Sequence, residues 1–166
     1  MGDDDVFVEE KVKDIYAGLP NTTFNLGTFK NYFFDYRDLD KNYFESEQFH
    51  ESFDSEGFNF YIGEYLDNEG FGTLPFIQRN RIAGIMIQMD SPLAHKYLFG
   101  SFKLFTSEKP FLKCIFLTRG KLRKEVFGDQ FDLFSWKELN YPADKKLIVE
   151  EFDFHEKPNI FQRYWV

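Results

Sequence analysis

The chain has 166 residues, enough for one domain to bury a large core without metal ions or disulfides, and we expect residues 1–166 to form a single domain. Its 23 phenylalanines predict an aromatic core, and its only cysteine, Cys114, excludes an intramolecular disulfide and any metal site built from clustered cysteines. The net charge of −8 opposes binding to nucleic acid or to anionic membranes.

The charge is unevenly distributed along the chain. Residues 1–70 hold 17 acidic and 5 basic residues, a net charge of −12, whereas residues 71–166 hold 11 and 15, a net charge of +4. An acidic surface attracts basic proteins and accelerates their encounter at low ionic strength. The acids therefore indicate either a binding surface for a basic protein or a surface that only keeps an aromatic-rich protein in solution.

The start of the chain indicates where the protein works. Met1–Asp5 is acidic, whereas a secretory signal needs basic residues followed by an apolar run. No stretch approaches the roughly 20 apolar residues that span a membrane. We therefore expect a soluble protein of the reducing cytoplasm.

Three segments before residue 57 predict helices. Apolar residues recur at helical spacing in residues 6–19, which predicts a first helix. Residues 28–36 carry aromatic side chains in both helical and alternating registers, so they fit a helix or a short strand, and we favour the helix. Between Leu39 and Phe53, acids interleave with aromatic residues, which indicates an acidic amphipathic helix from about Ser46, alone or after a loop.

The segments after residue 57 predict a sheet. Alternating side chains indicate strands over residues 58–66, 97–105 and 111–118. Ile82–Met89 is uncharged and rich in β-branched residues, so we expect it to be the central strand, with Pro75 at its entry and the turn Asp90–Pro92 at its end.

Later segments complete the expected architecture. Short turns would join the first four strands into an antiparallel meander, residues 131–136 alternate loosely, and residues 147–154 read as a last strand. The tail Ile160–Val166 is too aromatic to be solvated, so we expect it to pack on the domain or in an interface. The predicted fold class is α+β, with N-terminal helices packed on a mainly antiparallel sheet of five or six strands.

The three histidines predict no metal site. None lies at metal-binding spacing from another histidine or from the cysteine. His50 and Asp54 are four residues apart and could share a helical face, an arrangement that acidic surfaces produce without a metal. His95 lies in the expected turn between Ser91 and Lys96, and His155 in an expected loop.

No catalytic motif is present either. Cys114 lies between apolar neighbours in an expected strand, where it is a buried hydrophobe rather than a nucleophile. Pairs such as Glu45 and Glu47 arise by chance on acidic surfaces, and the basic run Lys121–Lys124 is typical of a hairpin end. We therefore predict that the protein is not an enzyme and needs no cofactor, and that it functions by binding.

Three segments resemble immunity proteins of bacterial contact-dependent growth inhibition systems. They are residues 68–76, 82–89 and 134–139, and the resemblance covers about residues 24–154. It implies a cytoplasmic protein that binds and neutralises the toxin domain of a delivered effector, often a nuclease. In one branch of that family the toxin adds a β-hairpin to the sheet of the immunity protein. The expected partner is thus a cognate basic toxin domain, bound in some cases at a sheet edge.

The acidic segment is the predicted partner-binding site, because binding hot spots combine aromatic rings with charged surroundings. The predicted residues are Asp38, Asp40, Tyr43, Glu45, Glu47, Phe49, Glu51, Asp54 and Glu56. Two alternatives remain open: a small-molecule-binding enzyme with an aromatic pocket, and a homo-oligomeric structural protein joined through its aromatic tail. The oligomeric state is not predicted.

Overall fold

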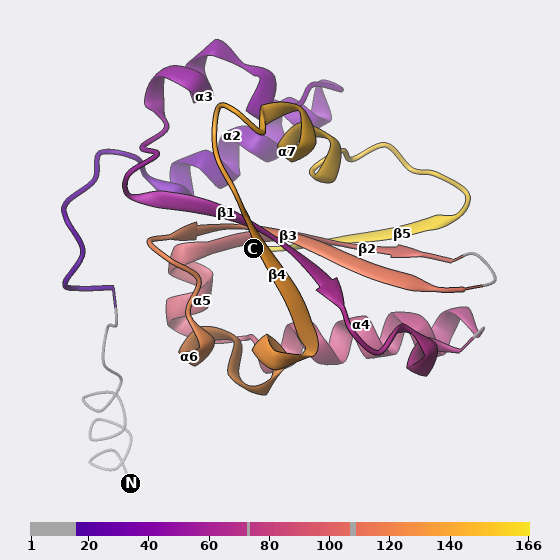
Figure 1. Cartoon of the computed structure of the whole chain (residues 1–166). Helices are drawn as coiled ribbons and strands as arrows, with labels where there is room; N and C mark the ends of the chain where they lie inside the picture. Colours follow the sequence, from indigo (N-terminus) through magenta and orange to yellow (C-terminus); the bar gives the residue numbers. More distant parts are fainter. Residues whose placement is uncertain (1–15, 73, 107–108) are drawn as a thin grey trace, which may run out of the picture.

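A five-stranded antiparallel sheet with helices on both faces forms the molecule (Figure 1). The computed structural model describes residues 16–72, 74–106 and 109–166. The predicted α+β class is confirmed, because the helices that precede the first strand pack on this sheet. The elements, in chain order, are α2 (Leu26–Asp38), η1 (Tyr43–Glu45), α3 (Glu47–Ser52), β1 (Phe58–Tyr65), η2 (Asn68–Phe71), α4 (Pro75–Gln88), α5 (Pro92–Tyr97), β2 (Leu98–Phe105), β3 (Phe111–Arg119), α6 (Lys124–Phe127), η3 (Gly128–Leu133), β4 (Phe134–Leu139), α7 (Lys145–Glu151) and β5 (Ile160–Trp165).

The sheet is organised around β3. The strand order is β4-β1-β3-β2-β5, and every neighbouring pair is antiparallel. From Cys114 to Leu117, β3 is covered on both faces, and each of these residues is at most 1% exposed. Strands β2 and β3 form a hairpin, but β1 pairs with β3 and β4, so the predicted four-strand meander is wrong.

The expected central strand, Ile82–Met89, is helical. It belongs to α4 and its C-cap, and α4 begins with Pro75, whose fixed φ and missing N–H suit the first helical position. The residues that α4 buries, Gln78, Ile82 and Ile85, are followed by buried Met89, so burial recurs every three or four residues. Ile87, in the same apolar run, is 71% exposed, so this stretch is one face of an amphipathic helix and not a strand covered on both sides.

The expected last strand, residues 147–154, is also mostly helical. It contains most of α7, which buries Ile148 and Glu151, and Phe152 is buried directly after it. The aromatic tail instead supplies the edge strand β5, so the prediction that it packs on the domain is confirmed. Most of the predicted helix over residues 6–19 lies outside the described residues, and Tyr16–Gly18 form a turn.

The other local predictions are close to the observed elements. The predicted helix over residues 28–36 is α2, and the predicted acidic helix is α3, whose N-cap Ser46 accepts a hydrogen bond from the amide of Phe49. The strands predicted over residues 58–66, 97–105 and 111–118 are β1, β2 and β3. Residues 131–136 divide between η3 and β4.

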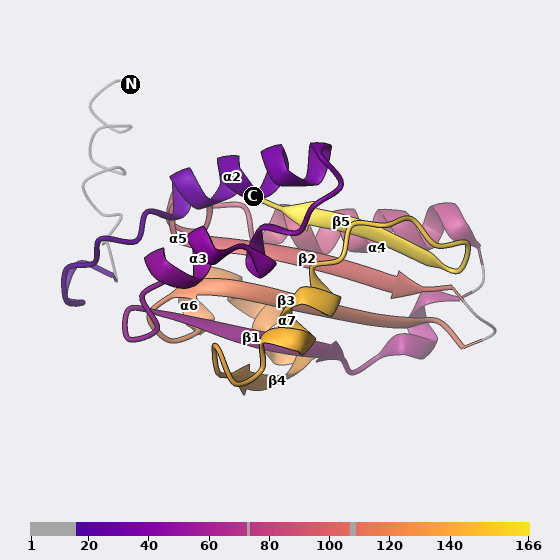
Figure 2. The same cartoon turned by 90° about the horizontal axis from the view of Figure 1, so that it is seen from above.

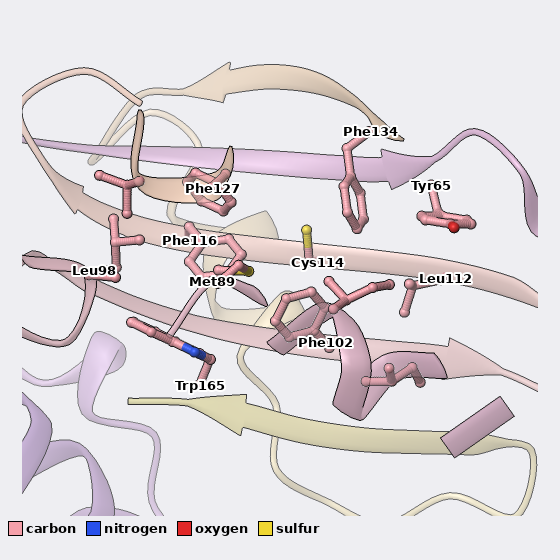
Figure 3. Close-up of a cluster of buried hydrophobic side chains, with 14 of the residues drawn as sticks. Tyr65, Met89, Leu98, Phe102, Leu112, Cys114, Phe116, Phe127, Phe134 and Trp165 are labelled. Carbon is pink, nitrogen blue, oxygen red and sulfur yellow. The ribbon is translucent and has the colours of Figure 1, made fainter. Parts of the chain in front are cut away.

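Two aromatic cores lie on opposite faces of the sheet (Figures 1 and 2). On one face, α4, α5 and α6 cover a cluster that includes Phe102, Phe116 and Trp165 (Figure 3). On the other face, α2, η1, α3 and α7 cover a cluster built from phenylalanines such as Phe29 and Phe99. The second core positions the acidic segment, because the helices that cover it carry the predicted site residues.

Candidate functional site

The acids of the predicted site follow the chain from the end of α2, through η1 and α3, to the turn before β1. Figure 1 shows α2 and α3 on one side of the sheet. Six of these acids are exposed. They are Asp38, Asp40, Glu45, Glu47, Glu51 and Glu56, which we call the acidic face. The structure therefore presents the acids of the predicted segment to solvent on one side of the sheet.

The two aromatic members of the predicted site are not on this surface. Tyr43 is 2% exposed and Phe49 is fully buried, and their rings contact each other at 5.8 Å between centroids. They were expected to anchor a partner, but they face the sheet. These two rings belong to the apolar sides of η1 and α3, and each short helix buries that side against the core. Their role is to hold the acids in place.

Asp54 is also a structural residue. Its carboxylate accepts hydrogen bonds from the Thr22 hydroxyl at 2.7 Å and from the amides of Glu56 and Gly57 at 3.1 Å, and the Thr22 bond is the main reason that its pKa is lowered. A Cβ at Gly57 would lie 2.4 Å from this carboxylate, so a side chain at position 57 would displace the carboxylate from its hydrogen bonds. Asp54 thus fixes the turn into β1 and is only half-exposed.

An acidic groove borders the acidic face. It has a volume of about 510 Å³ and lies between the segment that joins α2 to η1 and the C-terminal part of α7. Asp40 and Glu45 line one side, and Glu150 and Asp153 line the other. Two members of the predicted site therefore meet two acids that lie more than 100 residues later in the chain.

Asp40 is held in an unusual backbone conformation. Its φ of 59° is left-handed, which aspartate tolerates better than most residues. The amide of Asp40 donates to the Arg37 carbonyl and the amide of Lys41 donates to the Tyr36 carbonyl, which is the hydrogen-bond pattern of a Schellman cap. The end of α2 thus directs the chain into the groove, and the Asp40 side chain remains 78% exposed.

His155 connects the two sides of the groove. Its Nδ1 lies 2.6 Å from Asp153 and its Nε2 lies 2.8 Å from Asp40. These carboxylates, Asp153 first, raise the pKa of the imidazole. Burial alone would raise the pKa of Asp153, but hydrogen bonds and the charge of His155 outweigh it and lower that pKa.

This bridge predicts a pH-dependent contribution to stability. Since the pKa of His155 is higher in the folded than in the unfolded protein, its stabilising effect is complete below the unfolded value of 6.5 and is lost as the pH rises through the folded value. Replacing His155→Gln should therefore lower the urea midpoint near pH 6 more than near pH 9. Parallel pH profiles of the two proteins would contradict the bridge, and an NMR titration of the His155 ring should show a midpoint above 6.5.

Two lysines of the sheet fasten α7, which forms the far wall of the groove. Lys113 Nζ lies 2.6 Å from Glu151 Oε1, and Lys103 Nζ donates to the Glu150 carbonyl at 2.7 Å. Lys103 and Lys113 are direct cross-strand neighbours on β2 and β3. Positive charge at the C-terminal end of a helix is favourable, so the pair stabilises α7 over the sheet.

The remaining candidate groups are not assembled for chemistry. His50 and Asp54, which could have shared a helical face, do not pair, because α3 ends at Ser52 and His50 instead bonds to the Tyr141 hydroxyl at 2.9 Å. His95 lies in α5 rather than in a turn and stacks on Trp165. Cys114 is buried, as predicted, and burial raises the pKa of its thiol. In the described part of the chain, no group of three histidine, cysteine or acidic residues is placed to hold a metal ion.

The sequence prediction missed one wall of the groove. Glu150, Asp153 and His155 were read as parts of a strand and a loop, so they were not joined to the acidic segment. The spacing of Leu147, Ile148 and Glu151 fits a helix as well as a strand, and a helical reading would have exposed the acids on one face. Nothing local indicates that α7 lies beside η1, because strands β1, β2, β3 and β4 separate the two elements in the chain.

Comparison with known proteins identifies the family. The family model described as "Elongation factor 1 gamma, conserved domain" matches residues 11–122. Elongation factor 1-gamma of Drosophila melanogaster is 28% identical over 162 residues, which cover 92% of this chain and 35% of that protein. The protein of the same name from Carassius auratus is 28% identical over 150 residues, covering 87% and 33%, and that from Prunus avium is 32% identical over 96 residues, covering 55% and 22%. The chain thus spans about a third or less of the length of the curated relatives it matches.

This match corrects the expected function. The resemblance to immunity proteins of contact-dependent growth inhibition is wrong, and so is the expected toxin partner, because the segments 68–76 and 82–89 that suggested them lie inside the elongation factor match. The enzyme and homo-oligomer alternatives do not fit it either. The misleading motifs are fold elements, one of them a helix taken for a strand. Because the match covers more than half of its residues, the chain belongs to the family of the elongation factor 1 gamma conserved domain.

Proposed function

We propose that this chain is a non-catalytic, protein-binding domain of an elongation factor 1 assembly, and that its acidic face contacts other subunits of that assembly. The observation that carries the proposal is the family match over residues 11–122, which includes every element that bears the acidic face. The subunit name of the relatives, elongation factor 1-gamma, supports partners of the same factor. Because the chain spans only part of those relatives, the proposal concerns this domain within the assembly.

Three further features belong to the proposal. A translation factor subunit works in the cytoplasm, and no helix in the described ranges is long and apolar enough to cross a membrane. The buried Cys114 thiol with its raised pKa is unsuited to nucleophilic chemistry, which supports a non-catalytic role. Residues 1–166 act as one domain, and the two cores that share one sheet support this. Urea unfolding should therefore show a single transition.

The acidic face is tested by reversing its charge. The variant Glu45→Lys, Glu47→Lys, Glu51→Lys changes three exposed side chains that belong to neither core. If a basic surface of another elongation factor 1 subunit docks here, association should slow by about tenfold or more at low salt, because steering depends on this charge. The difference should shrink at high salt, where charges are screened. Stopped-flow or surface-plasmon measurements with the co-expressed subunits give the rates.

The matched control reverses three other exposed acids, Glu64→Lys, Asp67→Lys and Glu69→Lys, near the end of β1. Both variants change the net charge equally, so only the position differs. Equal slowing of association in both variants would show that net charge, and not the acidic face, governs binding. If the unaltered protein binds no elongation factor 1 subunit, the proposal as a whole fails.

A further inference from the structure

A second groove, opposite in charge, runs along the free edge of the sheet. It has a volume of about 730 Å³ and is lined by residues of β5, of α4, of the end of α2 and of the segment after α7. Figure 2 shows β5 as the edge strand of the sheet. Four basic side chains line it: Arg37, Arg79, Lys157 and Arg163. Glu156 is the one acid among its lining residues in the described part of the chain. We call it the basic groove.

Two of these arginines share one aromatic ring. The guanidinium carbon of Arg79 lies 5.0 Å from the centre of the Phe161 ring, and that of Arg163 lies 5.5 Å from it. Within the described ranges, neither arginine forms an ion pair with a carboxylate. Stacking on a ring orients a guanidinium and leaves its N–H donors open to an anion. Arg79 and Arg163 therefore present oriented donors at an exposed position.

The other two cations are partly engaged. Arg37 stacks over Phe34 at 4.6 Å and lies 3.5 Å from the exposed Asp38, while Lys157 lies 3.8 Å from Asp153. Exposed pairs of this kind contribute little and exchange readily with another anion. They add positive charge at the rim of the basic groove.

The floor of the groove offers main-chain hydrogen bonds. β5 pairs with β2 alone among the described strands, so its other edge ends the sheet. In an antiparallel strand, alternate residues direct their N–H and C=O groups away from the paired neighbour. A polypeptide main chain can bond to such groups, whereas a nucleic acid backbone has no matching series of donors. Pro75 and Ile160 also line the groove and offer apolar contacts.

From this combination we infer that the basic groove binds an acidic, extended polypeptide segment of a partner protein. Carboxylates of the segment pair with Arg79 and Arg163, and its main chain lies along β5. The charge of the site is opposite to that of the acidic face, so the two surfaces take different partners or different parts of one partner. The inference does not depend on the proposed elongation factor role, and β5 lies outside residues 11–122.

The test uses a dye-labelled eight-residue peptide of alternating glutamate and valine and measures fluorescence anisotropy with the full chain. The unaltered protein should bind it, and Arg79→Gln with Arg163→Gln should weaken binding about tenfold or more, since charge-assisted bonds to arginine are the strong ones. The matched control, Lys145→Gln with Lys146→Gln on α7, removes the same charge elsewhere and should change affinity less than about twofold. The thermal unfolding midpoints of both variants should stay close to that of the unaltered protein, because none of the four side chains is buried.

Other outcomes overturn the inference. These are no peptide binding by the unaltered protein, equal weakening in both double variants, or tighter binding of a single-stranded DNA octamer that the arginine substitutions also weaken. A peptide N-methylated at every residue lacks main-chain donors and should bind more weakly; equal affinity would show that the edge of β5 is not used. The variant Glu45→Lys, Glu47→Lys, Glu51→Lys should bind the peptide no more weakly than the unaltered protein, which separates failure here from failure of the proposed function.

Discussion

Replacing Phe99→Ala should lower the free energy of unfolding by about 3–5 kcal/mol, the usual cost of emptying a large buried aromatic site. Phe99 is fully buried on β2. Its ring lies 5.0 Å from that of Phe33, 5.5 Å from that of Phe29, and 5.5 Å from that of Phe152, with which it stacks. It therefore joins α2 and the residue after α7 to the sheet. Urea unfolding followed by tryptophan fluorescence gives the change directly.

Phe105→Ala is the matched control, since it removes the same side chain from the same strand. Phe105 is half-buried at the end of β2, and its ring contacts that of Phe111 at 6.1 Å. A loss of about 1 kcal/mol is expected there, because little cavity forms at the surface. Equal losses at positions 99 and 105 would mean that the core beneath α2 is not the main source of stability. That result would remove the physical basis for a rigid acidic face.

Local patterns predicted the sheet elements well where one period dominated. β1 alternates over most of its length, β2 and β3 carry apolar side chains at the majority of their positions, and the predicted bounds of all three lie within two residues of the observed ones. α4 failed because an uncharged run such as Ile82–Met89 fits a buried strand and a helix alike. Pro75 and buried Gln78 extend the helical spacing two turns toward the N-terminus. A window that includes them favours a helix over a strand.

The order of the strands was not predictable from local signals. β1 lies next to β3 although α4, α5 and β2 intervene in the chain. Burial marks the middle of the sheet, because β3 is buried on both faces from Cys114 to Arg119 and its neighbour β2 is buried from Leu98 to Phe102. The meander prediction assumed that short turns join consecutive strands. In the structure, η2, α4 and α5 lie between β1 and β2 in the chain.

The candidate site also contains residues that local patterns predicted and residues that they did not. The acids from Asp38 to Glu56 were found because charge on an amphipathic helix faces water whatever the fold. Tyr43 and Phe49 were taken for surface anchors because a sequence does not distinguish a ring that covers the sheet from one that awaits a partner. The pairing of His155 with Asp40 spans 115 residues and depends on where α7 sits, so no spacing rule reveals it.

Replacing Lys113→Met should lower the free energy of unfolding by about 3 kcal/mol, because it leaves the Glu151 carboxylate nearly buried without its closest cation. The two side chains are 22% and 10% exposed and lie 2.6 Å apart. Lys103, the cross-strand neighbour of Lys113, also interacts with the charge of Glu151. Burial lowers the pKa of Lys103, so it replaces Lys113 poorly as the cation that neutralises Glu151.

The decisive comparison is the double variant Lys113→Met with Glu151→Leu. Removing both charges removes the unpaired ion, so the double variant should recover to within about 1 kcal/mol of the unaltered protein, as buried pairs replaced by apolar residues often do. A double variant as unstable as Lys113→Met alone would show that the lysine acts by packing rather than by charge. If the double variant recovers, α7 packs on the sheet without either charge and the groove between Asp40 and Asp153 persists. The Lys113–Glu151 ion pair then stabilises the position of α7 by neutralising one buried carboxylate.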